Sequence, residues 1–132
     1  MSVIYDVTFD GGSLGNPGKG YGSYVIDTAD RRGQPVRLDF SPNGEIVTNN
    51  QAEYRSLIAA LVKILEIGGA EGPSVVIHGD SKLVLEQLAG RWKVKHAGLA
   101  PLVREAQSLL AEFAAVSFEW HGRASSVKRL GH

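Results

Sequence analysis

The sequence predicts an α/β domain with a five-stranded mixed sheet, in which three antiparallel strands precede parallel strands and helices flank the sheet. The first observation behind this prediction is that apolar and polar residues alternate in the first third of the chain, as in antiparallel strands. The second is a change to helical spacing from Ala52 onward, interrupted by short β-branched runs typical of buried strands. The third is the length of 132 residues, from which we expect a single domain over residues 1–132.

The first third of the chain is expected to form an antiparallel meander. Every second residue is apolar in residues 2–9, which predicts a strand that ends at Asp10, before a stretch rich in glycine. Two further strands are expected over residues 21–28 and about 35–47, with turn signals at Asp30 and Gly33 and then a hairpin signal at Pro42-Asn43-Gly44.

The rest of the chain is expected to alternate between helices and buried strands. Apolar residues recur at helical spacing after Ala52, with Thr48, Asn49 or Asn50 as the N-cap, and the helix is expected to end at Gly68-Gly69. The remaining expected elements are a strand over residues 74–77, a short helix over 81–88, a longer amphipathic helix over 99–113 and a last strand over 116–120.

Composition says little about a partner, because 14 basic residues balance 14 acidic ones. Two basic clusters follow the first helix, and either could bind a polyanion or form ordinary solvated surface: Arg91, Lys93 and Lys95, then Arg123, Lys128 and Arg129. The chain has no cysteine, no recognisable signal peptide and no apolar run near the roughly 18 residues of a membrane span. We therefore expect a soluble cytoplasmic protein, a monomer, with no membrane partner.

Three acidic residues stand where expected elements begin or end. Asp10 closes the first strand, Glu53 lies in the first turn of a helix, and Asp80 follows the buried strand over residues 74–77. Each has an ordinary structural explanation on its own, as a turn residue, a helix-dipole partner or an N-cap. If the two strands are parallel neighbours, however, Asp10 and Asp80 lie side by side and Glu53 can reach the same point.

Three converging carboxylates repel one another, and divalent cations relieve that repulsion. A ligand set made only of oxygen atoms suits Mg²⁺ or Mn²⁺ better than zinc. Such a site fits phosphoryl transfer by two ions about 4 Å apart, one activating a water and the other stabilising the leaving oxygen. We expect Asp10 to be the ligand that bridges the ions.

Three segments resemble the successive signature segments of type 1 ribonuclease H: DGGSLGNPGKGYG (residues 10–22), TNNQAE (48–53) and GDSKLVLEQLAGRWKVK (79–95). The element order and loop lengths also agree with that family, and the resemblance extends to about Arg123. It implies a ribonuclease H-like fold. It also implies an endonuclease that hydrolyses the RNA strand of RNA–DNA hybrids with Mg²⁺ or Mn²⁺, leaving 5′-phosphate and 3′-hydroxyl ends.

The resemblance also implies roles for single residues. Asp10, Glu53 and Asp80 match the family's catalytic metal ligands. Further positions are expected to contact the hybrid, through 2′-hydroxyls, the minor groove or phosphates: Gly11, Gly12, Ser13, Asn16, Asn49, Asn50, Gln51, Trp92, Lys93 and Lys95. For Trp92 a surface-covering indole is an equally good interpretation.

The C-terminal segment departs from the family's pattern. The family supplies a fourth acid from a C-terminal helix, but no carboxylate follows Glu119 in this sequence. Aligned on Arg123, the family's Asn falls on Ser126 and its Asp on Leu130; the alternative alignment puts Lys128 at the Asp position. The candidates to replace the fourth acid are Ser125, Ser126, Lys128 and His132. For His132 the simpler interpretation is that it belongs to a disordered chain end.

Two other functions remain open at this stage. The missing fourth acid is compatible with a weakly active or non-catalytic module that binds hybrids or double-stranded RNA. A nuclease or integrase that reads DNA on the same fold is a third interpretation, which the TNNQAE and GNPGKGYG segments disfavour.

Overall fold

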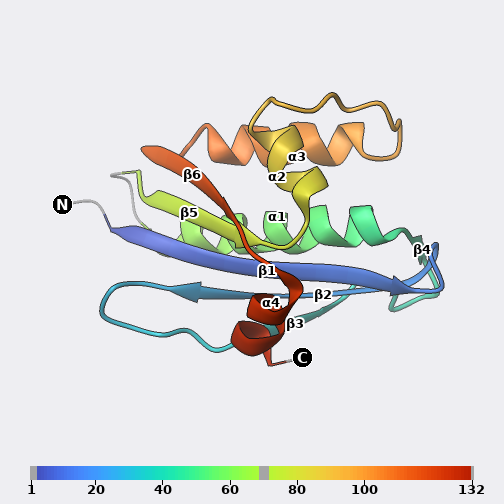
Figure 1. Ribbon diagram of the computed structural model, residues 1–132, viewed down its shortest axis with the longest axis horizontal. Helices are drawn as coiled ribbons and strands as arrows, with labels where there is room; N and C mark the ends of the chain where they lie inside the picture. The colour runs from blue at the N-terminus through green and yellow to red at the C-terminus, as the bar shows by residue number, and fades with distance from the viewer. Residues whose placement is uncertain (1–2, 69–71, 132) are drawn as a thin grey trace.

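The computed structural model describes residues 3–68 and 72–131. Within these residues the chain forms a six-stranded mixed sheet and four helices. The strands lie in the order β3-β2-β1-β5-β6, and β4 pairs with β2 (Figure 1). The predicted α/β class is therefore confirmed, with one strand more than expected.

The two longest strands, β1 (Ile4–Leu14) and β2 (Gly18–Asp27), form an antiparallel pair in which Asp10 lies opposite Ser23. The prediction that the first strand ends at Asp10 is wrong, because β1 continues to Leu14. The glycines after Asp10 belong to the strand for a packing reason. A Cβ on Gly11 would lie 2.5 Å from the backbone carbonyl of Ala52, so only glycine lets β1 approach the first helix this closely.

The segment expected as one strand over residues 35–47 forms two, β3 (Val36–Asp39) and β4 (Ile46–Val47). A tight connection separates them, in which the Ser41 hydroxyl donates to the carbonyl of Glu45 at 2.6 Å and accepts from the N–H of Gly20 at 2.8 Å. Gly44 has a φ of 80°, a conformation that favours glycine. This turn accounts for the sixth strand.

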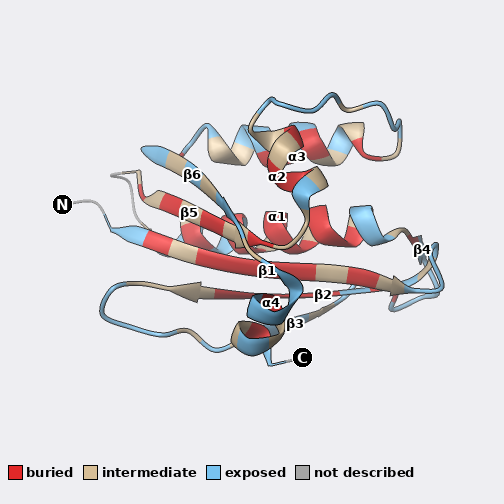
Figure 2. Cartoon of the chain, viewed as in Figure 1, coloured by how far each residue is buried: buried red, intermediate tan, exposed pale blue. Residues whose placement is uncertain are grey.

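Helix α1 (Asn49–Ile67) covers the sheet and supplies much of the core. It begins three residues before Ala52, because Thr48 and Gln51 form a capping box that satisfies backbone N–H groups at its start. Gly68 is its C-cap, as predicted, whereas Gly69 lies outside the described residues. Figure 2 shows buried residues along α1 and along the middle of β1 and β5.

Strand β5 (Ser74–Gly79) pairs in parallel with both β1 and β6 (Ala115–Trp120). The first and fourth predicted strands are therefore parallel neighbours, which is the condition under which Asp10 and Asp80 lie side by side. Helices α2 (Lys82–Leu88) and α3 (Ala100–Leu110) follow β5, and Ser81 caps α2. Helix α3 ends before Phe113, where we expected it to end.

A fourth helix, α4 (Arg123–Leu130), was not predicted. Few of its residues are apolar, so the sequence lacks the periodicity of a helix that packs on a core. The contacts that hold it are long-range: Leu130 is fully buried, and Arg129 forms an ion pair with Asp27 at the end of β2. Figure 1 shows α4 apart from the other three helices, beside β1 and β2. No helix among the described residues is long and apolar enough to cross a membrane.

Candidate active site

The structure brings Asp10, Glu53 and Asp80 together from three elements. Asp10 lies in β1, Glu53 in the first turns of α1, and Asp80 between β5 and the N-cap of α2. Each offers a carboxylate oxygen, and these oxygen atoms lie within 4.8 Å of one another. The parallel pairing of β1 with β5 and the close approach of α1 at Gly11 produce this convergence.

One backbone N–H group connects two of the acids. The N–H of Gly11 donates to Oδ1 of Asp10 at 2.9 Å and to Oε1 of Glu53 at 3.0 Å. Both side chains are buried, with Asp10 4% and Glu53 7% exposed. The backbone of β1 therefore helps to fix the orientation of both carboxylates.

The electrostatics of Glu53 are compatible with a cation in the cluster. Burial, the neighbouring carboxyl of Asp10 and the charge of Asp80 raise the pKa of Glu53 well above its ordinary value. Its Oε2 atom is buried and has no hydrogen-bond partner among the described residues. A buried carboxylate oxygen without a partner is unfavourable unless a cation completes the site. An all-oxygen donor set of this kind fits Mg²⁺ or Mn²⁺.

A positive charge faces the acids from α4. The guanidinium of Arg123 forms an ion pair with Oδ2 of Asp10 and lies 3.5 Å from Oδ2 of Asp80. The charge of Asp10 raises the pKa of Arg123 most, and the hydrogen bond to Asp10 and the charge of Asp80 raise it further. In the sequence, Arg123 stands out only as an alignment anchor and a member of a basic cluster. Its position directly after the last strand was the one available signal.

Two aromatic residues at the end of β6 lie close to the acids and were not predicted as site residues. The indole N–H of Trp120 donates to the carbonyl of Asp80 at 3.1 Å, which fixes the backbone beside that carboxylate. Burial lowers the pKa of His121, while the charges of Asp80 and Asp10 act in the opposite direction. His121 Nε2 lies 2.7 Å from Oγ of Ser126, so it is tied to α4.

The residues that were candidates to replace the fourth acid differ in burial and in their contacts. Ser126 is buried and bonded to His121, Ser125 and Lys128 are exposed, and His132 lies outside the described residues. Leu130, at the Asp position of one alignment, is fully buried. The α4 side chain that reaches the acids is the cation Arg123.

The predicted hybrid-contacting residues fall into two groups. In the first, Asn49 Oδ1 accepts from the N–H of Ser13 at 2.8 Å, and the N–H of Asn49 donates to Oδ1 of Asn16 at 3.0 Å. These bonds join the end of β1 to the start of α1, beside Gly11 and Gly12. Asn50 is exposed next to them, whereas the side chain of Gln51 is engaged in the capping box.

The second group lies on the segment between α2 and α3. Trp92 is 47% exposed, and Lys93 and Lys95 are exposed as well. The bend is held by Gln87, whose side-chain amide donates to the carbonyl of Lys93 at 3.3 Å. An exposed indole between Arg91 and Lys93 is available for contact rather than buried in the core.

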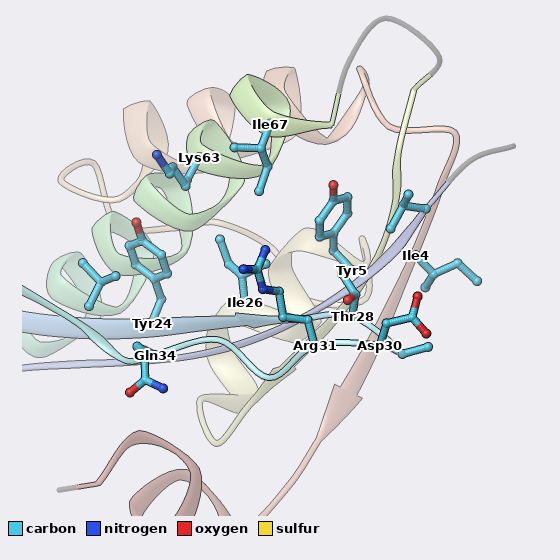
Figure 3. A pocket seen from close by; sticks show the side chains of 13 residues that line it. Ile4, Tyr5, Tyr24, Ile26, Thr28, Asp30, Arg31, Gln34, Lys63 and Ile67 are labelled. Carbon is cyan, nitrogen blue, oxygen red and sulfur yellow. The ribbon is translucent and has the colours of Figure 1, made fainter.

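A separate hollow of about 900 Å³ lies over the other ends of β1 and β2. Its walls are largely apolar and include Tyr5, Tyr24, Ile26 and Ile67, with Lys63 at its edge (Figure 3). It shares no residue with the acidic cluster. The candidate chemistry therefore belongs to the acids and not to this hollow.

The fold and the site together define an α/β protein of the ribonuclease H fold, with an acidic cluster where strands β1 and β5 meet helix α1. The family model described as "Reverse transcriptase-like" matches residues 9–127. The N-terminal ribonuclease H domain of Rv2228c from Mycobacterium tuberculosis is similar in structure, with 39% identity, a TM-score of 0.85 and coverage of 96% of this chain and 88% of that one. The chain belongs to the type 1 ribonuclease H family, as its signature segments predict.

Two further comparisons bear on function. LC11-RNase H1, solved in complex with an RNA/DNA hybrid, is 26% identical with a TM-score of 0.82, covering 94% of this chain and 89% of that one. The bifunctional protein Rv2228c of Mycobacterium tuberculosis is 46% identical over 128 residues, which are 96% of this chain. The chain spans only 33% of the length of that relative.

Proposed function

We propose that this chain is a ribonuclease that hydrolyses the RNA strand of RNA–DNA hybrids with the help of a divalent cation. The observation that carries the proposal is the convergence of Asp10, Glu53 and Asp80 within 4.8 Å, in a chain of the ribonuclease H family. The hybrid bound by LC11-RNase H1 supports the choice of substrate.

The three carboxylates would hold Mg²⁺ or Mn²⁺, and the unpartnered Oε2 of Glu53 supports this role. A bound cation supplies positive charge that promotes ionisation of a water and stabilises the charge that develops on the phosphate. We also propose that two such ions are bound when the substrate is present. The residues of the chain contribute fixed geometry: the Gly11 N–H orients two of the acids, and Trp120 fixes the backbone beside the third.

Hydrolysis of this kind joins the hydroxyl of water to phosphorus and breaks the bond from phosphorus to the 3′-oxygen, which receives a proton. The products are then a 5′-phosphate and a 3′-hydroxyl.

The hydrogen bonds that join Asn49 to Ser13 and Asn16 give the junction of β1 and α1 a fixed backbone. We propose that this backbone, with Gly11 and Gly12, contacts 2′-hydroxyls and so distinguishes RNA from DNA.

The exposed segment between α2 and α3 would add affinity without reading sequence. Trp92 offers an indole face to the DNA strand, and Lys93 and Lys95 offer charge to phosphates. Binding through these residues should weaken with added salt.

The experiment that tests the proposal is cleavage of an end-labelled hybrid in Mg²⁺ or Mn²⁺. Wild type should cut the RNA strand only, and Asp10→Asn should lower the rate by at least about a hundredfold, since a ligand of the proposed cation is lost. Asp30→Asn, a matched change of an exposed acid outside the cluster, should cut at the wild-type rate.

Failure of folded wild type to cut in either metal would contradict the proposal. Hybrid binding that is unaffected by Asp10→Asn, without turnover, would instead support the non-catalytic module. The observation that favours this alternative is that no Asp or Glu follows Glu119 to serve as the fourth acid of the site.

A further inference from the structure

Arg123 contacts the acidic cluster from its open side. Its guanidinium pairs with Oδ2 of Asp10 and lies 3.5 Å from Oδ2 of Asp80. The side chain of Arg123 is 62% exposed, whereas those of Asp10 and Asp80 are 5% and 14% exposed. The charged end of a long, solvated side chain therefore reaches one oxygen on each of two acids, one buried and one half-buried, that belong to the candidate cation site.

The guanidinium of Arg123 can leave these two oxygens without movement of the rest of α4. Arg123 is the first residue of α4, and the other end of the helix is held by the ion pair of Arg129 with Asp27 and by the buried Leu130. Because the Arg123 side chain is largely in water, releasing its guanidinium requires little loss of packing.

A guanidinium and a divalent cation cannot share the same oxygens without repelling each other at short range. The two also offer alternative ways to offset the repulsion among the three carboxylates. We propose that Arg123 and a divalent cation compete for Asp10 and Asp80, so that binding of the cation displaces the guanidinium. This inference rests on the proposed function, because it takes the acids as cation ligands.

The test is the affinity of the chain for Mn²⁺ and Mg²⁺, measured by calorimetry without substrate after removal of metal with a chelator. Arg123→Gln should bind Mn²⁺ about fivefold more tightly than wild type, which is the scale of an exposed ion pair. Arg104→Gln removes the same charge from an exposed position on α3 and should leave the affinity unchanged. An unchanged or weaker affinity in Arg123→Gln would overturn the inference.

A second measurement on the unaltered protein does not depend on how the variant folds. The side-chain Nε–H resonance of Arg123, assigned through its bonds to the backbone of the same residue, should move during a Mg²⁺ titration. The midpoint of this shift in Mg²⁺ concentration should agree with the Mg²⁺ affinity measured by calorimetry. A resonance that stays fixed while Mg²⁺ binds contradicts the competition alone, whereas wild type that binds neither metal contradicts the proposed function as well.

Discussion

Glu53 illustrates how a candidate functional residue can lower the stability of the fold. Its carboxyl is buried beside Asp10, and burial and that neighbour raise its pKa well above the ordinary value. One of its oxygens has no hydrogen-bond partner among the residues described. A charge kept in such a place is unfavourable for folding unless a cation is bound.

We therefore expect Glu53→Gln to unfold less readily than wild type when a chelator is present. The gain should be about 1–2 kcal/mol in the free energy of unfolding at pH 8, because an amide carries no charge and can still accept from the N–H of Gly11. A carboxyl whose pKa is raised in the folded state destabilises it fully above that pKa. The difference between the two proteins should accordingly shrink as the pH falls through the raised pKa.

Urea unfolding monitored by circular dichroism at several pH values measures this difference. Asp30→Asn removes an exposed acid outside the cluster and provides the control. Equal stability of Glu53→Gln and wild type at pH 8 would show that the buried carboxyl carries no penalty.

The residues of the site also show what sequence reasoning can reach. Asp10, Glu53 and Asp80 were predictable because each falls in a segment that resembles a family signature, and the structure brings them together although Asp10 lies within β1 and not at its end. Arg123 was not predictable as their partner. Its contact with Asp10 spans 113 positions in sequence and depends on a helix that local periodicity does not reveal.

Among the elements, α4 depends most on tertiary contacts. It presents few apolar residues, and the Arg129 guanidinium pairs with Asp27 and donates to the carbonyl of Gly33 at 3.1 Å. Burial acts against the charge on Asp27, but hydrogen bonds from Arg129 and Gly33 hold the pKa of this carboxyl below its ordinary value. This ion pair therefore attaches α4 to the end of β2.

Asp27→Asn should lower the free energy of unfolding by about 1–3 kcal/mol at pH 7, because the half-buried Arg129 loses its charged partner. A carboxyl with a lowered pKa stabilises the fold above its unfolded pKa of about 4, and this contribution is lost as the pH falls further. The difference between variant and wild type should hence decrease in acid. Glu86→Gln, which removes an exposed ion pair with Arg91, is the matched control for chemical or thermal unfolding. An equally stable Asp27→Asn would mean that other contacts hold α4.

The strands show that a glycine does not by itself mark the end of an element. Glycines and an Asn-Gly pair predict turns, and the turn at Gly44 is present. The same reasoning fails at Gly11, where the strand continues because α1 passes within contact distance of its backbone. A glycine that permits close packing and a glycine that permits a turn look alike in one sequence, and only the position of the neighbouring element separates them.

Over the whole molecule, the acidic cluster joins parts of the chain that meet only in the folded state. Asp10 belongs to the central strand, Glu53 to the main helix and Asp80 to the crossover that follows β5. The repulsion among the three carboxylates acts against this assembly, and the same repulsion disappears in the unfolded chain, where the acids are far apart. A cation bound by all three should consequently stabilise the entire fold and not one loop.

Addition of Mg²⁺ or Mn²⁺ should therefore raise the Tm of the chelator-treated protein. At a concentration about 100 times the Kd, a cation that binds only the folded state adds about 2.7 kcal/mol to the free energy of unfolding. Asp80→Asn should lose most of that gain while unfolding normally in chelator, because it removes a ligand from the half-buried edge of the cluster. Scanning calorimetry at constant ionic strength, with NaCl in place of the divalent salt, separates binding from screening. If Tm rises equally in wild type and in Asp80→Asn, the cation binds elsewhere, and the three acids lose their assigned role as its ligands.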